Sequence, residues 1–161
     1  MNSPFHHAPL PEKRVSVDFE RLRAAASTVR RILVVDDDAD VRRLLETVLR
    51  RAGYVVSCAG DGEEGWDALC SEKYDALITD LEMPRLTGLG LLRRVRAGLL
   101  SLPVILVSGR MPWGESELGQ LLTPGFALAK PLSIPVLLAK VSGFLKPASG
   151  GSNCDRSAEP A

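Results

Sequence analysis

Short apolar runs alternate along the chain with segments in which apolar residues recur every three or four positions. Residues 31–35 (RILVV) form an apolar run rich in β-branched residues, which is typical of a strand buried on both faces. Apolar residues between 41 and 49 then fall at positions i, i+3, i+4, i+7 and i+8, which places them on one face of a helix. The same alternation predicts further strands at 55–59, 76–79, 104–107 and 126–129, and further helices at 63–71, 88–96, 115–122 and 134–145.

Strands that alternate with helices in this way favour a parallel sheet covered by helices on both faces. Crossovers between parallel strands are right-handed, so the carboxyl ends of all strands meet at one edge of the sheet. We therefore predict an α/β domain of five strands and five helices over residues 31–147. Residues 1–30 are expected to be a partly disordered extension with a possible short helix at 17–29, and residues 148–161 a flexible tail.

The composition of the 161 residues is that of an average soluble globular protein, with 45% apolar and 25% charged residues. Lys and Arg number 20, and so do Asp and Glu, which argues against direct DNA binding through a basic surface. Nothing in the sequence predicts a membrane-inserted segment or a secretory signal. The three scattered cysteines are interpreted as buried thiols of a cytoplasmic protein, without a zinc site or a disulfide framework.

Polar residues follow four of the predicted strands: Asp36 and Asp37 the first, Asp80 the third, Ser108 the fourth and Lys130 the fifth. Because the strand ends converge, we expect these side chains in one crevice. Three carboxylates there repel one another, by about 4 kcal/mol per pair at ~4 Å and an effective dielectric constant near 20. A hard divalent cation, best a partly hydrated Mg²⁺, would relieve this repulsion. A carboxylate beside such a metal, with an ammonium and a hydroxyl nearby, is suited to accept a phosphoryl group.

Four sequence segments carry a resemblance to a known family. VVDDDADVRRLL, ITDLEMPRLTG, PVILVSG and ALAKPL are similar to the motif regions of the response-regulator receiver domain of two-component signalling. The resemblance covers roughly residues 31–147 and includes all five polar residues in order. It implies a flavodoxin-like fold, which is a doubly wound parallel sheet with strand order 2-1-3-4-5.

The resemblance also implies a function and a set of site residues. Asp80 would be the phosphoacceptor, and the donor would be a sensor histidine kinase or a histidine phosphotransfer protein. Asp36, Asp37, Asp80 and the backbone carbonyl of Glu82 would bind Mg²⁺, with Asp36 acting through water. Such a module is not an enzyme beyond its own phosphorylation and slow autodephosphorylation, and it passes its signal to a downstream protein that the sequence does not identify.

Three further residues have roles that the resemblance implies. Ser108 would hydrogen-bond the phosphoryl group, Lys130 would pair with it, and the peptide bond between Lys130 and Pro131 would be cis. We also predict that Glu82 and Arg110, two residues beyond Asp80 and Ser108, form an ion pair that shields the phosphoryl group and tunes its loss.

The chain departs from the family in two places, both on the surface through which its members contact partners. Residues 110–125 (RMPWGESELGQLLTPG) are poor in helix-forming residues, and one strand position lacks the usual aromatic side chain. Members usually carry an aromatic residue three positions before the lysine, where this chain has Ala127. Phe126 is adjacent, but neighbouring strand residues point to opposite faces of a sheet. The alternative is therefore a pseudo-receiver, a docking module that keeps the fold without phosphorylation-dependent output.

Two other patterns have simpler interpretations. Residues 60–65 (GDGEEG) match the spacing of a dinucleotide-binding glycine motif, but Asp61, Glu63 and Glu64 would face the pyrophosphate, which favours an ordinary turn between strand and helix. The arginine pairs at 42/43, 50/51 and 93/94 are interpreted as solvated helix faces rather than a nucleic-acid surface.

Overall fold

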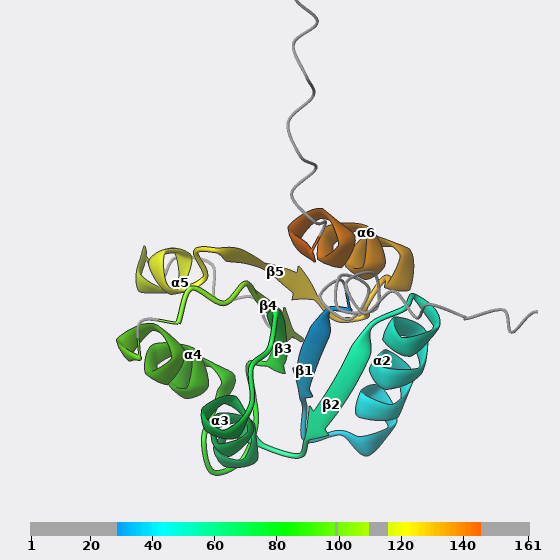
Figure 1. Cartoon of the computed structure of the whole chain (residues 1–161). Helices are drawn as coiled ribbons and strands as arrows, with labels where there is room; N and C mark the ends of the chain where they lie inside the picture. Colours follow the sequence, from blue (N-terminus) through cyan, green and yellow to red (C-terminus); the bar gives the residue numbers. More distant parts are fainter. Residues whose placement is uncertain (1–28, 99, 110–115, 146–161) are drawn as a thin grey trace, which may run out of the picture.

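The computed structural model of the chain describes residues 29–98, 100–109 and 116–145. Within these residues five strands alternate with five helices, as the hydrophobic pattern predicts (Figure 1). The strands are β1 (Arg31–Val35), β2 (Val55–Ala59), β3 (Ala76–Asp80), β4 (Val104–Ser108) and β5 (Gly125–Ala129). The helices are α2 (Ala39–Arg51), α3 (Gly62–Ser71), α4 (Gly88–Ala97), α5 (Ser116–Leu121) and α6 (Ile134–Leu145).

All five strands run parallel in one sheet of order β2-β1-β3-β4-β5, which confirms the predicted flavodoxin-like topology. β3 and β4 are buried along their whole length, and β1 is buried after its first residue. The edge strands β2 and β5 are only partly buried. This gradient is expected for a parallel sheet that is covered by helices on both faces.

Alternate strand residues pack into two separate hydrophobic clusters, one on each face of the sheet. Leu33 and Val35 lie in the cluster covered by α3, α4 and α5, whereas Ile32 and Val34 lie in the cluster covered by α2 and α6 (Figure 1). This is the two-residue period of a strand, and it explains why helices are needed on both faces.

Three of the helices begin at a polar side chain that accepts hydrogen bonds from their first backbone N–H groups. Asp38 caps α2, Asp61 caps α3 and Thr87 caps α4. Each cap satisfies donors that otherwise lack a partner at a helix start. The caps also determine where the preceding loops end, and two of these loops contain candidate site residues.

Strands β3 and β4 extend one residue further than predicted. Asp80 aligns with Val107 across the sheet, and Ser108 aligns with Ala129. Both candidate site residues therefore belong to the sheet itself, where the parallel ladder fixes the direction of their side chains.

The prediction of buried thiols is wrong for Cys58 and Cys70, which are both exposed. Cys58 lies on the edge strand β2, and Cys70 lies at an exposed position near the end of α3. Most of the possible helix at 17–29 and the tail at 148–161 lie outside the described residues, so the predicted domain limits stay predictions. None of the described helices is long and apolar enough to cross a bilayer.

Candidate functional site

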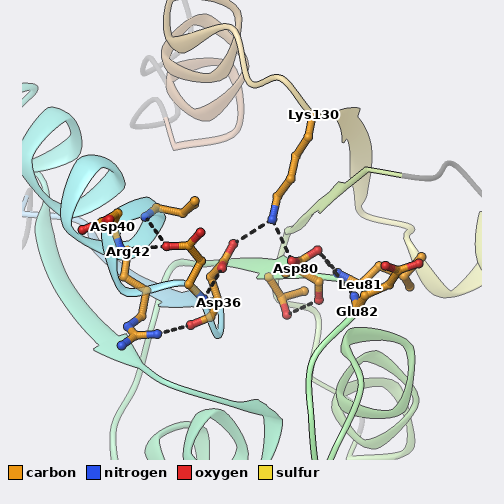
Figure 2. Close-up of polar contacts among 10 residues, drawn as sticks. Asp36, Asp40, Arg42, Asp80, Leu81, Glu82 and Lys130 are labelled. Atoms are coloured by element: carbon orange, nitrogen blue, oxygen red, sulfur yellow. Dashed lines mark hydrogen bonds and ion pairs between the residues drawn. The ribbon is translucent and has the colours of Figure 1, made fainter.

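Asp36, Asp37 and Asp80 converge at the carboxyl edge of the sheet. Figure 2 shows the first and the last of these side chains together with Lys130. One carboxylate oxygen from each lies within 4.8 Å of the other two. Asp80 ends β3 and is 6% exposed, and Asp36 follows β1 and is 1% exposed. Asp37, by contrast, is exposed. Topology alone brings these residues together, because β1 and β3 are neighbours in the sheet.

Lys130 reaches this cluster from the end of β5. Its Nζ lies 2.7 Å from Asp80 Oδ2 and 3.2 Å from Asp36 Oδ2 (Figure 2). The backbone of Lys130 is anchored as well, since its N–H donates to the carbonyl of Ser108 at 2.8 Å. The next peptide bond, from Lys130 to Pro131, is cis. Ser108 itself is fully buried at the end of β4, next to the backbone of Lys130.

The ammonium of Lys130 is stabilised by the two carboxylates that it contacts. Partial burial by itself lowers the pKa of Lys130, but the hydrogen bond to Asp80 and the charges of Asp36 and Asp80 together raise it. Lys130 is therefore fully charged at neutral pH. It is also the only basic side chain for which the described residues show an ion pair to this cluster.

Asp80 is held in one orientation by the backbone that follows it. Its Oδ1 accepts a hydrogen bond from the N–H of Leu81 at 2.7 Å and a longer one from the N–H of Glu82 at 3.4 Å (Figure 2). Its Oδ2 faces Lys130. The two oxygens thus have different partners, and the carboxylate is oriented before any ligand binds.

Asp36 is the most buried of the three carboxylates, and its surroundings disfavour its charge. Burial raises the pKa of Asp36, and the nearby charge of Asp80 raises it further. The N–H of Asp38, which donates to Asp36 Oδ1 at 2.9 Å, and Lys130 oppose this effect without cancelling it. The guanidinium of Arg42 binds the backbone carbonyl of Asp36 and not its carboxylate.

The donor set fits a hard divalent cation. Asp36, Asp37 and Asp80 offer the oxygen ligands that Mg²⁺ prefers, and one lysine leaves a net negative charge among these three acids. A surface depression of about 530 Å³ adjoins the cluster and is lined by Asp37, Glu82 and mostly apolar side chains. This depression leaves room for the water ligands that Mg²⁺ usually retains.

Phe126 and Ala127 of β5 point to opposite faces of the sheet, as predicted. Ala127 packs on the cluster under α3, α4 and α5, whereas Phe126 packs on the cluster under α2 and α6. Phe126 stacks on Phe144, with ring centroids 5.5 Å apart, and the Nζ of Lys140 lies 4.5 Å from its ring centroid. Phe126 therefore does not replace an aromatic side chain at position 127.

The glycine-rich turn at 60–65 is an ordinary connection between β2 and α3. Asp61 Oδ1 accepts from the N–H groups of Glu63 and Glu64, so the donors that a phosphate would need are already used. The three carboxylates of this turn bind arginines of the β3–α4 region instead. Arg94 makes a bidentate pair with Glu63, and both side chains remain partly exposed, so the pair lies on a solvated helix face.

Two arginines that sequence reasoning did not connect to the site lie beside it. Arg42 binds the Asp36 carbonyl, and Arg85, in the loop after Asp80, binds Asp61. Arg42 comes shortly after the three consecutive aspartates, and Arg85 directly follows Met83-Pro84, so both arginines lie near predicted site residues in the sequence. Their contacts with the Asp36 carbonyl and with Asp61 nevertheless depend on the tertiary fold. Arg110, the predicted partner of Glu82, lies outside the described residues, so this ion pair stays a prediction.

The chain matches the model of the response regulator receiver domain over residues 32–142. Two of the most similar curated proteins are response regulator MprA of Mycobacterium avium (strain 104) and of Mycobacterium tuberculosis (strain ATCC 25618 / H37Rv). Both are 39% identical to this chain over 116 residues. The match covers 72% of this chain and 51% and 50% of those proteins, so the chain spans about half the length of these relatives.

Solved structures with a similar fold point to the same family. A response regulator receiver protein from Pseudomonas putida is 34% identical with a TM-score of 0.66, over 71% of this chain and 97% of that one. The response regulator TrrA from Thermotoga maritima, crystallised in complex with Mg²⁺-BeF, is 29% identical with a TM-score of 0.66, over 72% and 99% of the two chains.

Proposed function

The chain belongs to the response regulator receiver family, and we propose that it is a receiver switched by phosphorylation of Asp80. The observation that carries this proposal is the arrangement around Asp80. A buried carboxylate at the end of β3 faces one ammonium, that of Lys130, and shares its edge of the sheet with two further carboxylates. Such an arrangement concentrates positive charge where phosphoryl oxygens would lie once a metal is bound.

In the proposed reaction, an oxygen of the Asp80 carboxylate attacks the phosphorus of a phosphohistidine. The O–P bond forms while the P–N bond breaks, and the electron pair of that bond stays on the imidazole nitrogen. The donor would be a sensor histidine kinase or a histidine phosphotransfer protein. Backbone contacts from Leu81 and Glu82 keep the Asp80 carboxylate from rotating, which lowers the entropic cost of aligning it with the phosphorus.

We assign the metal to Asp36, Asp37, Asp80 and the backbone carbonyl of Glu82. When bound there, Mg²⁺ would offset the negative charge of the incoming phosphoryl group. The proposal gives Lys130 the task of pairing with the phosphoryl oxygens, from a position that already contacts Asp80 Oδ2 at 2.7 Å.

Ser108 would donate its hydroxyl to the phosphoryl group from the end of β4. Contact with a downstream protein would then transmit the change, and Glu82 with Arg110 would tune how long the phosphoryl group survives. A cytoplasmic location and the absence of direct DNA binding stay predictions of the same kind, because no feature of the site bears on them. The only reaction proposed for this chain is its own phosphorylation and slow dephosphorylation.

The test is incubation with Mg²⁺ and a small acyl phosphate, followed by intact-mass measurement. The wild-type chain should gain one phosphoryl group that is stable in acid and labile in base, and Asp80→Ala should gain none. Asp67→Ala, which removes an exposed aspartate of α3 outside the cluster, is the matched control and should behave as the wild type.

Two results would contradict the proposal. Uptake of a phosphoryl group by Asp80→Ala would show that the acceptor is another residue. A wild-type chain that gains no phosphoryl group, with acyl phosphate or with a phosphorylated donor protein, would instead support the pseudo-receiver alternative, in which the fold serves only for docking.

A further inference from the structure

The loop between β3 and α4, residues 81–87, packs tightly against the first turn of α3. A Cβ atom added to Gly62 would lie 2.2 Å from the carbonyl oxygen of Leu86, so only glycine fits at this contact. The same loop contains Glu82, whose N–H contacts Asp80 and whose carbonyl we assign to the metal. The loop is therefore a link between the metal site and the start of α3.

Arg85 makes this link electrostatic as well. Its guanidinium forms an ion pair with the carboxylate of Asp61 and lies 3.2 Å from Glu64 Oε1. The Asp61 side chain is 2% exposed, whereas that of Arg85 is 60% exposed. A buried carboxylate needs a partner charge, and Arg85 supplies it from the loop that follows the phosphoacceptor.

The backbone at Arg85 shows that the side chain matters at this position. Its φ is 63°, in the left-handed region, and it is the only described non-glycine residue with a positive φ. Glycine adopts this conformation without a steric penalty, whereas a residue with a Cβ does so at a cost. Arginine is thus a poor choice for the turn itself, and its ion pair with Asp61 is the compensating contact.

We propose that Arg85 is a positioning residue for the metal site. The ion pair with Asp61 would fix the 81–87 loop on α3, and this would keep the Glu82 carbonyl and the two N–H groups that orient Asp80 in place. Arg85 touches neither metal nor phosphoryl group in this proposal, which rests on the metal assignment made above. Outer-shell contacts of this kind tune metal affinity by orienting the ligands.

The chain offers a matched control for this idea. Arg94 of α4 pairs with Glu63 of α3 through two contacts of 2.8 and 3.0 Å. Like Arg85, it joins the first turn of α3 to the region after β3, but it lies outside the 81–87 loop. Loss of Arg94 removes its pair with Glu63, and loss of Arg85 removes its pairs with Asp61 and Glu64, so both weaken the contacts of the start of α3, but only loss of Arg85 releases the loop.

The experiment is a Mg²⁺ titration followed by NMR at the backbone amides of Leu81 and Glu82, with phosphorylation rates measured at low and saturating Mg²⁺. In Arg85→Gly the Mg²⁺ dissociation constant should rise about tenfold, as for loss of an outer-shell contact. The phosphorylation rate should approach that of the wild type once Mg²⁺ saturates. Arg85→Lys should restore most of the affinity, and Arg94→Ala should leave it unchanged.

Each other outcome is decisive. An unchanged dissociation constant in Arg85→Gly, or an equal rise in Arg94→Ala, would overturn the positioning role while leaving the proposed metal site intact. A wild-type chain that does not respond to Mg²⁺ would overturn the metal assignment itself and the inference with it. If Arg85→Gly does not give the dispersed spectrum of a folded protein, Arg85→Gln replaces it in the same comparison.

Discussion

Acidic side chains are paired differently at the amino and carboxyl ends of the parallel strands. At the amino edge, Arg30 pairs with Asp75 at 2.7 Å and Arg31 pairs with Glu72, so each acid has its own base. At the carboxyl edge, two of the three clustered carboxylates, Asp36 and Asp80, share Lys130. These acids of the amino edge are paired one to one with arginines, whereas the acids of the carboxyl edge outnumber the lysine that pairs with them.

Exposure sharpens the difference between the edges. The ion-paired side chains of the amino edge are between 29% and 50% exposed, so water stabilises each charge even without its partner. At the carboxyl edge, Asp36 and Asp80 are 1% and 6% exposed, and little water reaches them. Excess buried charge is costly in a folded protein, and it persists where a ligand of opposite charge compensates it. We therefore expect the ion pairs of the amino edge to contribute to the stability of the fold, and the buried carboxylates of the carboxyl edge to serve ligand binding.

The largest expected effect comes from removing charge at the carboxyl edge in two different places. Asp37→Ala should weaken Mg²⁺ binding by about a hundredfold and abolish phosphorylation at ordinary Mg²⁺ concentrations, because it removes one of the carboxylates proposed to bind the metal directly. Lys130→Ala should leave Mg²⁺ affinity at least as high, since it removes a positive charge that repels the ion, while weakening the response to phosphorylation. Parallel Mg²⁺ titrations of the two variants measure this difference. Equal loss of affinity in both would mean that metal and lysine do not have separate roles.

Much of the carboxyl edge could be predicted from the sequence, because its residues follow from topology. Once residues 31–35 and 76–79 are recognised as parallel strands, Asp36 and Asp80 must meet at one edge. The opposite directions of Phe126 and Ala127 follow in the same way from the two-residue period of a strand. In each case, a local pattern and one rule of connectivity are sufficient.

Contacts that depend on how helices and loops pack could not be predicted in this way. Arg85 and Asp61 are both polar residues in turns, and nothing local indicates that the loop after β3 folds onto α3. Burial of the cysteines was predicted from the average behaviour of the residue type, which fails for Cys58 because β2 is an edge strand. Such predictions are limited because the rules of strand connectivity do not determine how loops and helices pack on one another.

A smaller effect concerns the stability of the metal-free protein. Burial, followed by the charge of Asp80, raises the pKa of Asp36 in the folded state. The stability that Asp36 contributes is then fully present below its unfolded pKa and is lost as pH rises through the folded pKa. Asp36→Asn should therefore raise the melting temperature at neutral pH by a few degrees, equivalent to about 1 kcal/mol, and should flatten its fall from mildly acidic to neutral pH. Thermal melts without Mg²⁺ measure both effects.

Asp38, two residues away, is the matched control because its pKa shifts in the other direction. Hydrogen bonds from the N–H groups of Asp40 and Val41 lower the pKa of Asp38. Its contribution is present above the unfolded pKa and is lost as pH falls through the folded pKa, so Asp38→Asn should lower the melting temperature at neutral pH. A lower melting temperature in both Asp36→Asn and Asp38→Asn would show that the excess charge of the carboxyl edge does not destabilise the fold.

The smallest effect is expected at the amino edge. Asp75→Ala removes the ion pair with Arg30 and the hydrogen bond of 2.8 Å that Asp75 Oδ2 accepts from the N–H of Arg31. An ion pair whose side chains are 33% and 29% exposed and one hydrogen bond together contribute about 1–2 kcal/mol, so urea unfolding should show a loss of that size. Mg²⁺ affinity and phosphorylation should not change, because the five residues of β1 separate the two edges by about 17 Å. Substitutions at sites that far apart have additive effects on the free energy of unfolding. The double variant Asp36→Asn/Asp75→Ala should therefore show the sum of the two single changes. A departure from additivity of more than about 0.5 kcal/mol would mean that β1 couples the edges, and charge balance at one end of the sheet could then no longer be considered independently of the other.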